Sequence, residues 1–241
     1  MQRKKTGSDT SSPVLPTCSV CSLHPACQPW NLEPEDLRSL ERIVERSTSV
    51  PAGQHLFRFG EALQSLYVVR SGAFKNYRVD SSGRERVLGF LFAGELVGID
   101  GIYPRRHEFH AVALTDATVC SLPYTSLTAL MERSEGLRRQ IFRLVSKDGV
   151  YSAAFSAHST AEERVVGMLM NLSNRNRINN RSASQIELPM SREDMGNYLR
   201  VPAETVTGVL TYLERQGLIE LSTTGVKVLD MSGLNTIIRH K

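Results

Sequence analysis

The sequence predicts an α+β protein with an antiparallel β-roll, a long connecting helix and a C-terminal winged helix-turn-helix. Short β-prone runs alternate with glycine turns from Ser49 to about Pro123, a texture typical of antiparallel barrels and double-sheet rolls. An apolar stripe at helical spacing follows, and two short helix patterns with a tight turn and a hairpin come last. We therefore expect a tail with a cysteine-rich segment over 1–30, the roll over 31–134, a long helix over 135–160 and the helix-turn-helix over 161–241.

Composition indicates a water-soluble globular protein. The 241 residues are 41% hydrophobic and 22% charged, and no apolar run approaches the roughly 18 residues that a membrane span needs. The basic N-terminus lacks the apolar segment of a secretory signal, so we expect a cytoplasmic protein with no membrane partner. The net charge of +4 permits nucleic-acid binding without requiring it.

The four cysteines form an uneven pattern. Cys18, Cys21 and Cys27 share one short segment, C-x2-C-x5-C, whereas Cys120 stands alone in a predicted strand. In the cytoplasm such residues are more often metal ligands or redox groups than disulfides. We expect Cys120 to be the fourth ligand of a site that fastens the N-terminal segment to the roll. The residues alone leave zinc and an iron–sulfur cluster about equally open.

The roll is expected to begin after a short amphipathic helix. Asn31 is its predicted N-cap, acidic residues fill its first turn, and its apolar positions continue to about Arg46. The predicted strand regions then follow in order: 54–60, 65–72, 73–79, 86–91, 94–98, 111–114 and 117–122.

Three further segments separate the roll from the C-terminal third. A short helix is predicted over Tyr124–Met131, and a longer one carries an apolar stripe from Leu137 to about Val150. That stripe could pack on the roll, pair with a second copy, or do both. Thr160 and Glu163 fit a capping box that opens another helix. The polar run 174–182 is predicted to be a loop.

The C-terminal third has the pattern of a winged helix-turn-helix. Ser191 caps a first helix that ends at Leu199, and a break at Arg200-Val201-Pro202 precedes a second helix over 203–215. Gly217 ends that helix, and two strands, 218–221 and 226–229, flank a turn at 222–225.

A helix–turn–helix pair alone indicates plain helical packing about as often as DNA binding. The short polar side chains on the second helix favour DNA binding here. Glu204, Thr207 and Thr211 share the outer face of the second helix, and a glutamate can accept a hydrogen bond from cytosine N4. We add Ser191 and Arg192, at the start of the first helix, as expected DNA contacts.

These features together resemble the Crp/Fnr superfamily of bacterial transcription regulators, and specifically its Fnr-type oxygen sensors. The resemblance covers nearly the whole chain from Cys18 to the wing. Its most specific parts are C-x2-C-x5-C with one distant cysteine, Gly94-Glu95-Leu96-Val97-Gly98, Ala161-Glu162-Glu163-Arg164, and Gly196-Asn197-Tyr198-Leu199 leading into Glu204-Thr205.

The resemblance implies a sensor built on a cyclic-nucleotide-binding-like roll. By that likeness Cys18, Cys21, Cys27 and Cys120 hold an oxygen-labile [4Fe–4S] cluster, which favours a homodimer through the long helix. The dimer binds a two-fold operator, contacts RNA polymerase and controls anaerobic or microaerobic genes.

Two alternatives accompany this interpretation. A zinc-stapled regulator would keep DNA binding without oxygen sensing, and an iron–sulfur electron carrier or enzyme would use the same cysteines. An electron carrier would not need the C-terminal third, and the six histidines are scattered without an obvious nucleophile. We therefore expect no enzyme activity.

The chain departs from the family pattern at three places. The Arg-Ser pair that holds a cyclic phosphate in some members is missing; Arg105, Arg106 and Glu108 lie in the matching stretch, so we expect no cyclic nucleotide. Gly208 stands where an arginine usually reads guanine, and Pro202 replaces a capping hydroxyl residue. The stretch between Leu144 and Ala161 is about three residues short, close to one helical turn, and lacks an expected acidic residue, which affects dimerisation.

Overall fold

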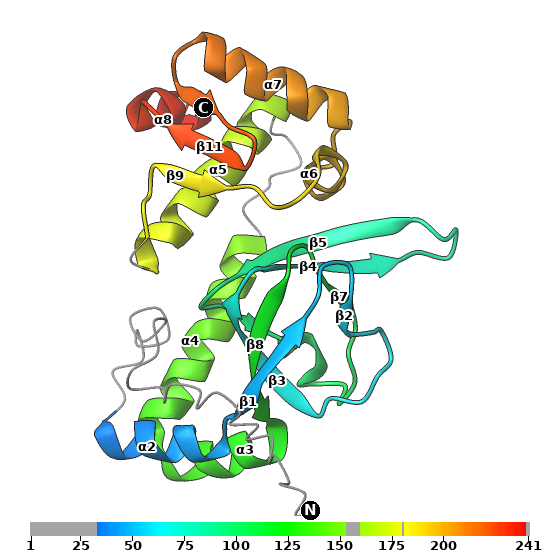
Figure 1. Ribbon diagram of the computed structural model, residues 1–241, viewed down its shortest axis with the longest axis vertical. Helices are drawn as coiled ribbons and strands as arrows, with labels where there is room; N and C mark the ends of the chain where they lie inside the picture. The colour runs from blue at the N-terminus through cyan, green and yellow to red at the C-terminus, as the bar shows by residue number, and fades with distance from the viewer. Residues whose placement is uncertain (1–32, 153–159, 180, 240–241) are drawn as a thin grey trace, which may run out of the picture.

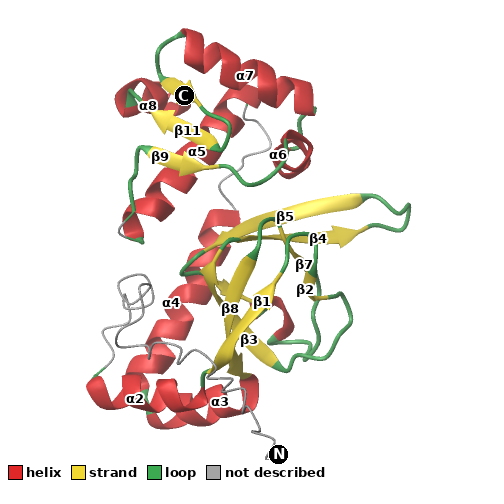
Figure 2. Ribbon diagram, viewed as in Figure 1, coloured by secondary structure: helices red, strands yellow, loops and turns green. Residues whose placement is uncertain are grey.

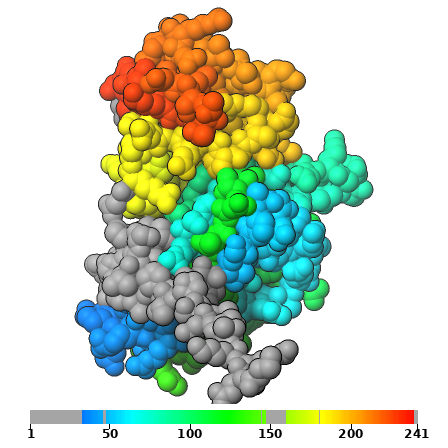
Figure 3. Space-filling view, viewed as in Figure 1, coloured from blue at the N-terminus to red at the C-terminus, as the bar shows by residue number. Residues whose placement is uncertain are grey.

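The structure is a computed structural model that describes residues 33–152, 160–179 and 181–239. A β-roll and a C-terminal helical unit are stacked along the longest axis, and a long helix runs beside the roll (Figure 1). The space-filling view shows the C-terminal unit resting on the roll, with a hairpin of the roll projecting to one side (Figure 3). No helix in the described part of the chain is long and apolar enough to cross a membrane.

The first described helix is shorter than the sequence predicts. Helix α2 spans Pro34–Ile43 with Glu33 as its N-cap, so the prediction of Asn31 as N-cap, outside the described residues, is wrong. Proline suits the first helical turn because its missing N–H has no helical partner there. The predicted end near Arg46 is also wrong, because Glu45–Val50 forms strand β1 and pairs antiparallel with β8.

The predicted strands of the roll are confirmed, and together with β1, which the sequence did not predict, they form two four-stranded antiparallel sheets with the orders β1-β8-β3-β6 and β2-β7-β4-β5 (Figure 2). The remaining strands are β2 His55–Phe57, β3 Ser65–Ser71, β4 Ala73–Val79, β5 Glu85–Phe92, β6 Leu96–Val97, β7 His110–Ala113 and β8 Ala117–Pro123, with the short 3-10 helix η2 at Ile99–Gly101. Gly72 joins β3 to β4 at φ +77°, and a Cβ there would lie 2.6 Å from the Asp116 carbonyl oxygen. That turn therefore needs glycine.

Two apolar cores hold the roll and its helices together. Val69, Phe74 and Val119 lie inside the roll and are completely buried. The outer side of the sheet that contains β8 is covered by α2, by α3 (Tyr124–Arg133) and by α4 (Glu135–Ser152). Leu137 and Ile141 bury the inner face of α4 against this sheet. Both predicted helices are confirmed, and Gly149 lies within α4 without ending it.

Helix α5 (Ala161–Ile178) begins as predicted and ends later. Thr160 Oγ1 accepts from the Glu163 N–H, and Glu163 accepts in return from the Thr160 N–H, which confirms the capping box. The predicted loop over 174–182 is wrong as far as residue 178. In this last part of the helix the Arg175 side chain reaches the roll, where Nε donates to Glu95 Oε1 at 2.7 Å.

The winged helix-turn-helix is confirmed and contains two further elements. Its parts are α6 Arg192–Leu199, α7 Ala203–Arg215, β10 Ile219–Leu221 and β11 Gly225–Val228. Strand β9 (Gln185–Glu187) completes a sheet of order β10-β11-β9, and α8 (Met231–Arg239) packs against α5. The sequence predicted neither β9 nor α8.

Candidate nucleic-acid interface and cysteine site

Helix α7 presents one apolar and one polar face. Val206, Leu210 and Leu213 are at most 1% exposed and anchor the helix in the C-terminal core. Glu204 and Thr207 are exposed and Thr211 is partly exposed, and their spacing of three and four residues places them on one side of the helix. The structure thus brings the three predicted base-reading residues together on a surface that can enter a DNA groove.

The outer face of α7 has open space at Gly208, where the resemblance noted in the sequence leads us to expect an arginine. Gly208 is exposed, and a Cβ built there would meet nothing within 4 Å. Thr207 Oγ1 donates to the Ala203 carbonyl oxygen at 3.1 Å, which leaves its oxygen available as an acceptor. Pro202 is the N-cap of α7 and makes no side-chain capping bond.

The start of α6 is more engaged with the protein than the sequence indicates. Ser191 Oγ accepts from the Asp194 N–H at 3.0 Å and so caps the helix. Arg192 is half-buried, with Nη1 3.2 Å from the Met195 sulfur, and burial lowers the pKa of its guanidinium. These two predicted DNA contacts lie beside α7, but each already has a structural role.

Two basic residues near α7 were not predicted as site residues. Arg200 is exposed in the turn between α6 and α7 and adopts φ +59°, a left-handed conformation that arginine rarely takes. Lys227 lies on β11 of the wing and pairs with Glu220 at 3.1 Å. The sequence signal for both is a basic residue at a turn or wing of a helix-turn-helix, where phosphate contacts are made.

Cys120 lies in β8, as predicted, opposite Val68 of β3. Its half-buried side chain packs into the cluster beneath α2, α3 and α4, and Leu40 of α2 belongs to the same cluster. Cys18, Cys21 and Cys27 lie outside the described residues.

No metal site is complete within the part of the chain that the structure describes. No group of three histidine, cysteine, aspartate or glutamate residues in that part could hold a metal ion. A site that includes Cys120 therefore needs ligands from outside the described residues.

Arg105, Arg106 and Glu108 lie in the stretch that matches the cyclic-phosphate loop of some family members. Arg105 and Arg106 are both exposed, and the Arg105 guanidinium lies 4.8 Å from the centre of the Tyr124 ring. Glu108 pairs with Arg78 at 3.5 Å. These contacts are those of solvated surface residues.

Comparison with known proteins matches both units to characterised families. Residues 47–134 match the cyclic nucleotide-binding domain family, and residues 163–237 match the Crp-like helix-turn-helix domain family. The transcriptional activator protein anr of Pseudomonas aeruginosa is 39% identical over 216 residues, which cover 88% of each protein. The chain belongs to the Crp/Fnr family of transcription regulators. It is thus a DNA-binding regulator and not an enzyme.

Other Crp/Fnr proteins extend the likeness. The anaerobic regulatory protein of Haemophilus influenzae is 35% identical over 220 residues, covering 90% of this chain and 86% of that protein. The structure of FixK2 from Bradyrhizobium japonicum aligns with a TM-score of 0.71 over 80% of this chain and 96% of that one, at 23% identity. The second match shows a shared Crp/Fnr fold, from the roll to the helix-turn-helix.

Proposed function

We propose that this Crp/Fnr regulator responds to oxygen through a [4Fe–4S] cluster held by Cys18, Cys21, Cys27 and Cys120. The observation that carries the proposal is the position of Cys120. It lies on a rigid central strand, on the side of the sheet where α2 continues from the cysteine segment. The relative named as an anaerobic regulatory protein supports the same conclusion.

The donor set fits this cofactor. Four thiolates are the ordinary ligands of a [4Fe–4S] cluster, and the hydrophobic surroundings of Cys120 would limit access of water to its sulfur. The cluster supplies reactivity toward oxygen. The chain's own part is to fix one ligand on β8 and to join the other three to α2, so that loss of the cluster frees the N-terminal segment from the roll.

Anaerobic purification with iron and sulfide analysis tests the cofactor. We expect four irons and four sulfides per chain and a visible absorption band that bleaches in air. Cys120→Ser should lose the band, whereas Ser121→Ala, a change at the neighbouring buried residue, should keep it. A colourless wild-type protein with one zinc would instead establish the zinc-stapled regulator, and a cluster protein without DNA affinity would favour the electron carrier.

We also propose that α4 forms the homodimer interface. Leu137 and Ile141 are buried against the roll, but Phe142 is 63% exposed and Val145 is 38% exposed one turn along the same helix. An apolar stripe of this kind on a long helix is typical of helix pairing. Phe142→Glu should shift the anaerobic protein from dimer to monomer in light scattering, and Arg143→Glu is the matched control at a neighbouring exposed residue. A wild-type monomer with and without the cluster would refute a dimerisation switch.

The proposed DNA contacts are Glu204, Thr207 and Thr211 for bases, with Ser191 and Arg192 near the phosphates. A two-fold dimer predicts a palindromic operator with half-sites about one helical turn apart. Selection from a random DNA pool tests this prediction. Because Gly208 cannot make the arginine–guanine contact, we expect relaxed preference at one guanine in each half-site. Full preference for the unmodified Fnr-type half-site would contradict that expectation.

The remaining parts of the proposal follow from the family. We expect the regulator to contact RNA polymerase, to act in the cytoplasm on anaerobic or microaerobic genes, and to need no cyclic nucleotide. DNA affinity measured with and without cyclic AMP tests the last point, and a rise in affinity with the nucleotide would contradict it. The division at residues 31, 135 and 161 stays a prediction.

A further inference from the structure

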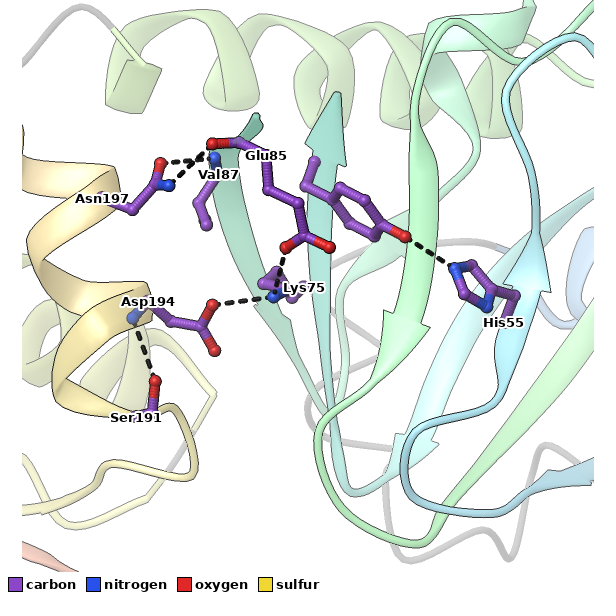
Figure 4. Close-up of polar contacts among 8 residues, drawn as sticks. His55, Lys75, Glu85, Val87, Ser191, Asp194 and Asn197 are labelled. Atoms are coloured by element: carbon purple, nitrogen blue, oxygen red, sulfur yellow. Dashed lines mark hydrogen bonds and ion pairs between the residues drawn. The ribbon is translucent and has the colours of Figure 1, made fainter. Parts of the chain in front are cut away.

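Helix α6 is fastened to the roll by a side chain that acts like a neighbouring strand. Strand β5 is at the edge of its sheet, where backbone groups lack a strand partner. The Val87 N–H donates to Asn197 Oδ1 at 2.8 Å, and Asn197 Nδ2 donates to the Glu85 carbonyl oxygen at 2.8 Å (Figure 4). One side-chain amide of α6 thus satisfies both a donor and an acceptor of the strand.

An ion pair reinforces this contact from the next strand. Lys75 Nζ on β4 lies 2.7 Å from Asp194 Oδ1 and 3.2 Å from Glu85 Oε2 (Figure 4). The side chains of Lys75 and Asp194 are only 12% and 19% exposed, so water screens the pair less than it screens a surface salt bridge. Burial opposes the charge on Lys75, but Asp194 and Glu85 outweigh it and raise the lysine pKa above its ordinary value.

Apolar packing makes β5 part of the C-terminal core. Val87 and Phe90 are each 4% exposed and belong to the same buried cluster as Met195 and Leu199 of α6. The Phe90 ring meets Tyr198 edge-on, with ring centres 5.4 Å apart. On the other side of Phe90, Arg175 of α5 donates to its carbonyl oxygen at 2.7 Å.

The geometry leaves the DNA-reading surface open. Helix α6 contacts both β5 and α7, and α7 lies beyond α6 from the roll (Figure 1). Glu204 and Thr207 of α7 are exposed. The direction of α7 relative to the roll is therefore fixed through α6 without covering the residues that read bases.

We propose that Asn197 is a positioning residue for DNA binding, which, together with the Lys75–Asp194 pair, locks α6 to the edge of β5 and sets the orientation of α7. A dimer meets two half-sites at once, so both copies of α7 must hold a fixed spacing and direction. A helix-turn-helix unit that is loose on the roll has to be ordered when it binds, which lowers affinity. The proposal rests on DNA binding by the C-terminal unit and not on the cluster.

Asn197→Ala in the full-length protein tests the proposal with two measurements. Hydrogen exchange of the Val87 amide should become at least tenfold faster, while the Val226 amide in the separate β10-β11-β9 sheet keeps its rate. The Kd for the duplex that the wild-type protein selects from a random pool should rise at least fivefold. Asn235→Ala is the matched control, because among the described residues its amide pairs with Met231 of its own helix, at 2.9 Å, and it should change neither measurement.

A second variant tests the lock from the side of the roll. Lys75→Met should also weaken DNA binding, and the double variant should lose less than the product of the two fold-changes, because both residues hold one contact. Faster Val87 exchange with a Kd within twofold of wild type would overturn the positioning role. Unchanged Val87 exchange in Asn197→Ala would overturn the contact itself. Failure of the wild-type protein to select any duplex would overturn DNA binding and the proposal together.

Discussion

Helices α6 and α7 are neighbours in one motif, yet the outer face of α6 is covered by the roll and the outer face of α7 is exposed. Each buries one face in the C-terminal core, with Met195 and Leu199 from α6 and Val206 and Leu210 from α7. The remaining face of α6 is occupied by β4 and β5 of the roll, whereas that of α7 is open. Outer-face residues of α7 such as Glu204 and Thr207 can therefore change with the operator at little cost to the fold, because they are exposed. Residues of α6 are constrained by their contacts with the roll as well.

The largest effect should come from the inner face of α7. Leu210 is 1% exposed, so Leu210→Ala should lower the free energy of unfolding by about 2–5 kcal/mol and abolish DNA binding at moderate denaturant. Urea unfolding followed by circular dichroism measures the change. Thr207→Ala on the outer face should alter stability by no more than about 0.5 kcal/mol. Equal losses in both variants would contradict the inner–outer distinction.

Restoring arginine on the outer face should sharpen DNA specificity without disturbing the fold. Gly208→Arg meets open space, and a bidentate contact with guanine adds about 1–3 kcal/mol of discrimination. We expect the selected half-site to gain a preferred guanine and the protein to become slightly more stable, because glycine disfavours helix by about 1 kcal/mol. Competition binding with guanine-substituted duplexes measures this. An unchanged preference would mean that position 208 does not face a base.

Removing the cap of α6 should give a smaller loss. Ser191→Ala deletes the bond from the Asp194 N–H and should lower the free energy of unfolding by about 1 kcal/mol. Ser191→Asp keeps an acceptor and should retain most of the stability, but it should weaken DNA binding by placing a negative charge near phosphate. Thermal unfolding and filter binding separate the two effects. Wild-type DNA affinity in Ser191→Asp would place residue 191 away from the DNA.

The smallest effect should be a pH dependence of the free energy of unfolding, which comes from two histidines of the roll. His55 Nε2 lies 2.8 Å from the Tyr77 hydroxyl, and the His110 ring stacks on Tyr77 at 4.8 Å. Burial, with a further contribution from the Arg58 charge, lowers the pKa of both histidines below 6.5, although the carboxylates of Glu61 and Glu85 oppose the shift.

Lowered histidine pKa values mean that the unfolded chain takes up protons first as the pH falls. The stability that the neutral rings contribute is therefore present above pH 6.5 and lost as the pH falls below that value. Urea midpoints at pH 7.5 and pH 5.5 should differ in this direction. His110→Phe keeps a ring against Tyr77 and should make the pH dependence of stability shallower. If the variant and the wild type depend equally on pH, other titratable groups cause the dependence.

Local sequence signals predicted the elements whose partners lie close in the chain. The capping box at Thr160, the N-cap at Ser191 and the glycine-bounded strands of the roll all depend on short spacings. The cysteine pattern likewise predicts a metal site from spacing alone, and the β-prone run 117–122 correctly placed Cys120 on a strand. The missed strand β9 pairs with β11, about forty residues further along, and no local pattern reports such a partner.

The sequence by itself determined the fold class, the family and the polar character of the α7 outer face, because periodicity, caps and motifs are local properties. Three contacts were decided only by the tertiary structure: Arg175 with Glu95, Asn197 with the edge strand β5, and Lys75 with Asp194. Lys75 and Asp194 are 119 residues apart. Their contact exists because hydrophobic burial brings β5 and α6 into one core, and the polar groups at its margin then need partners.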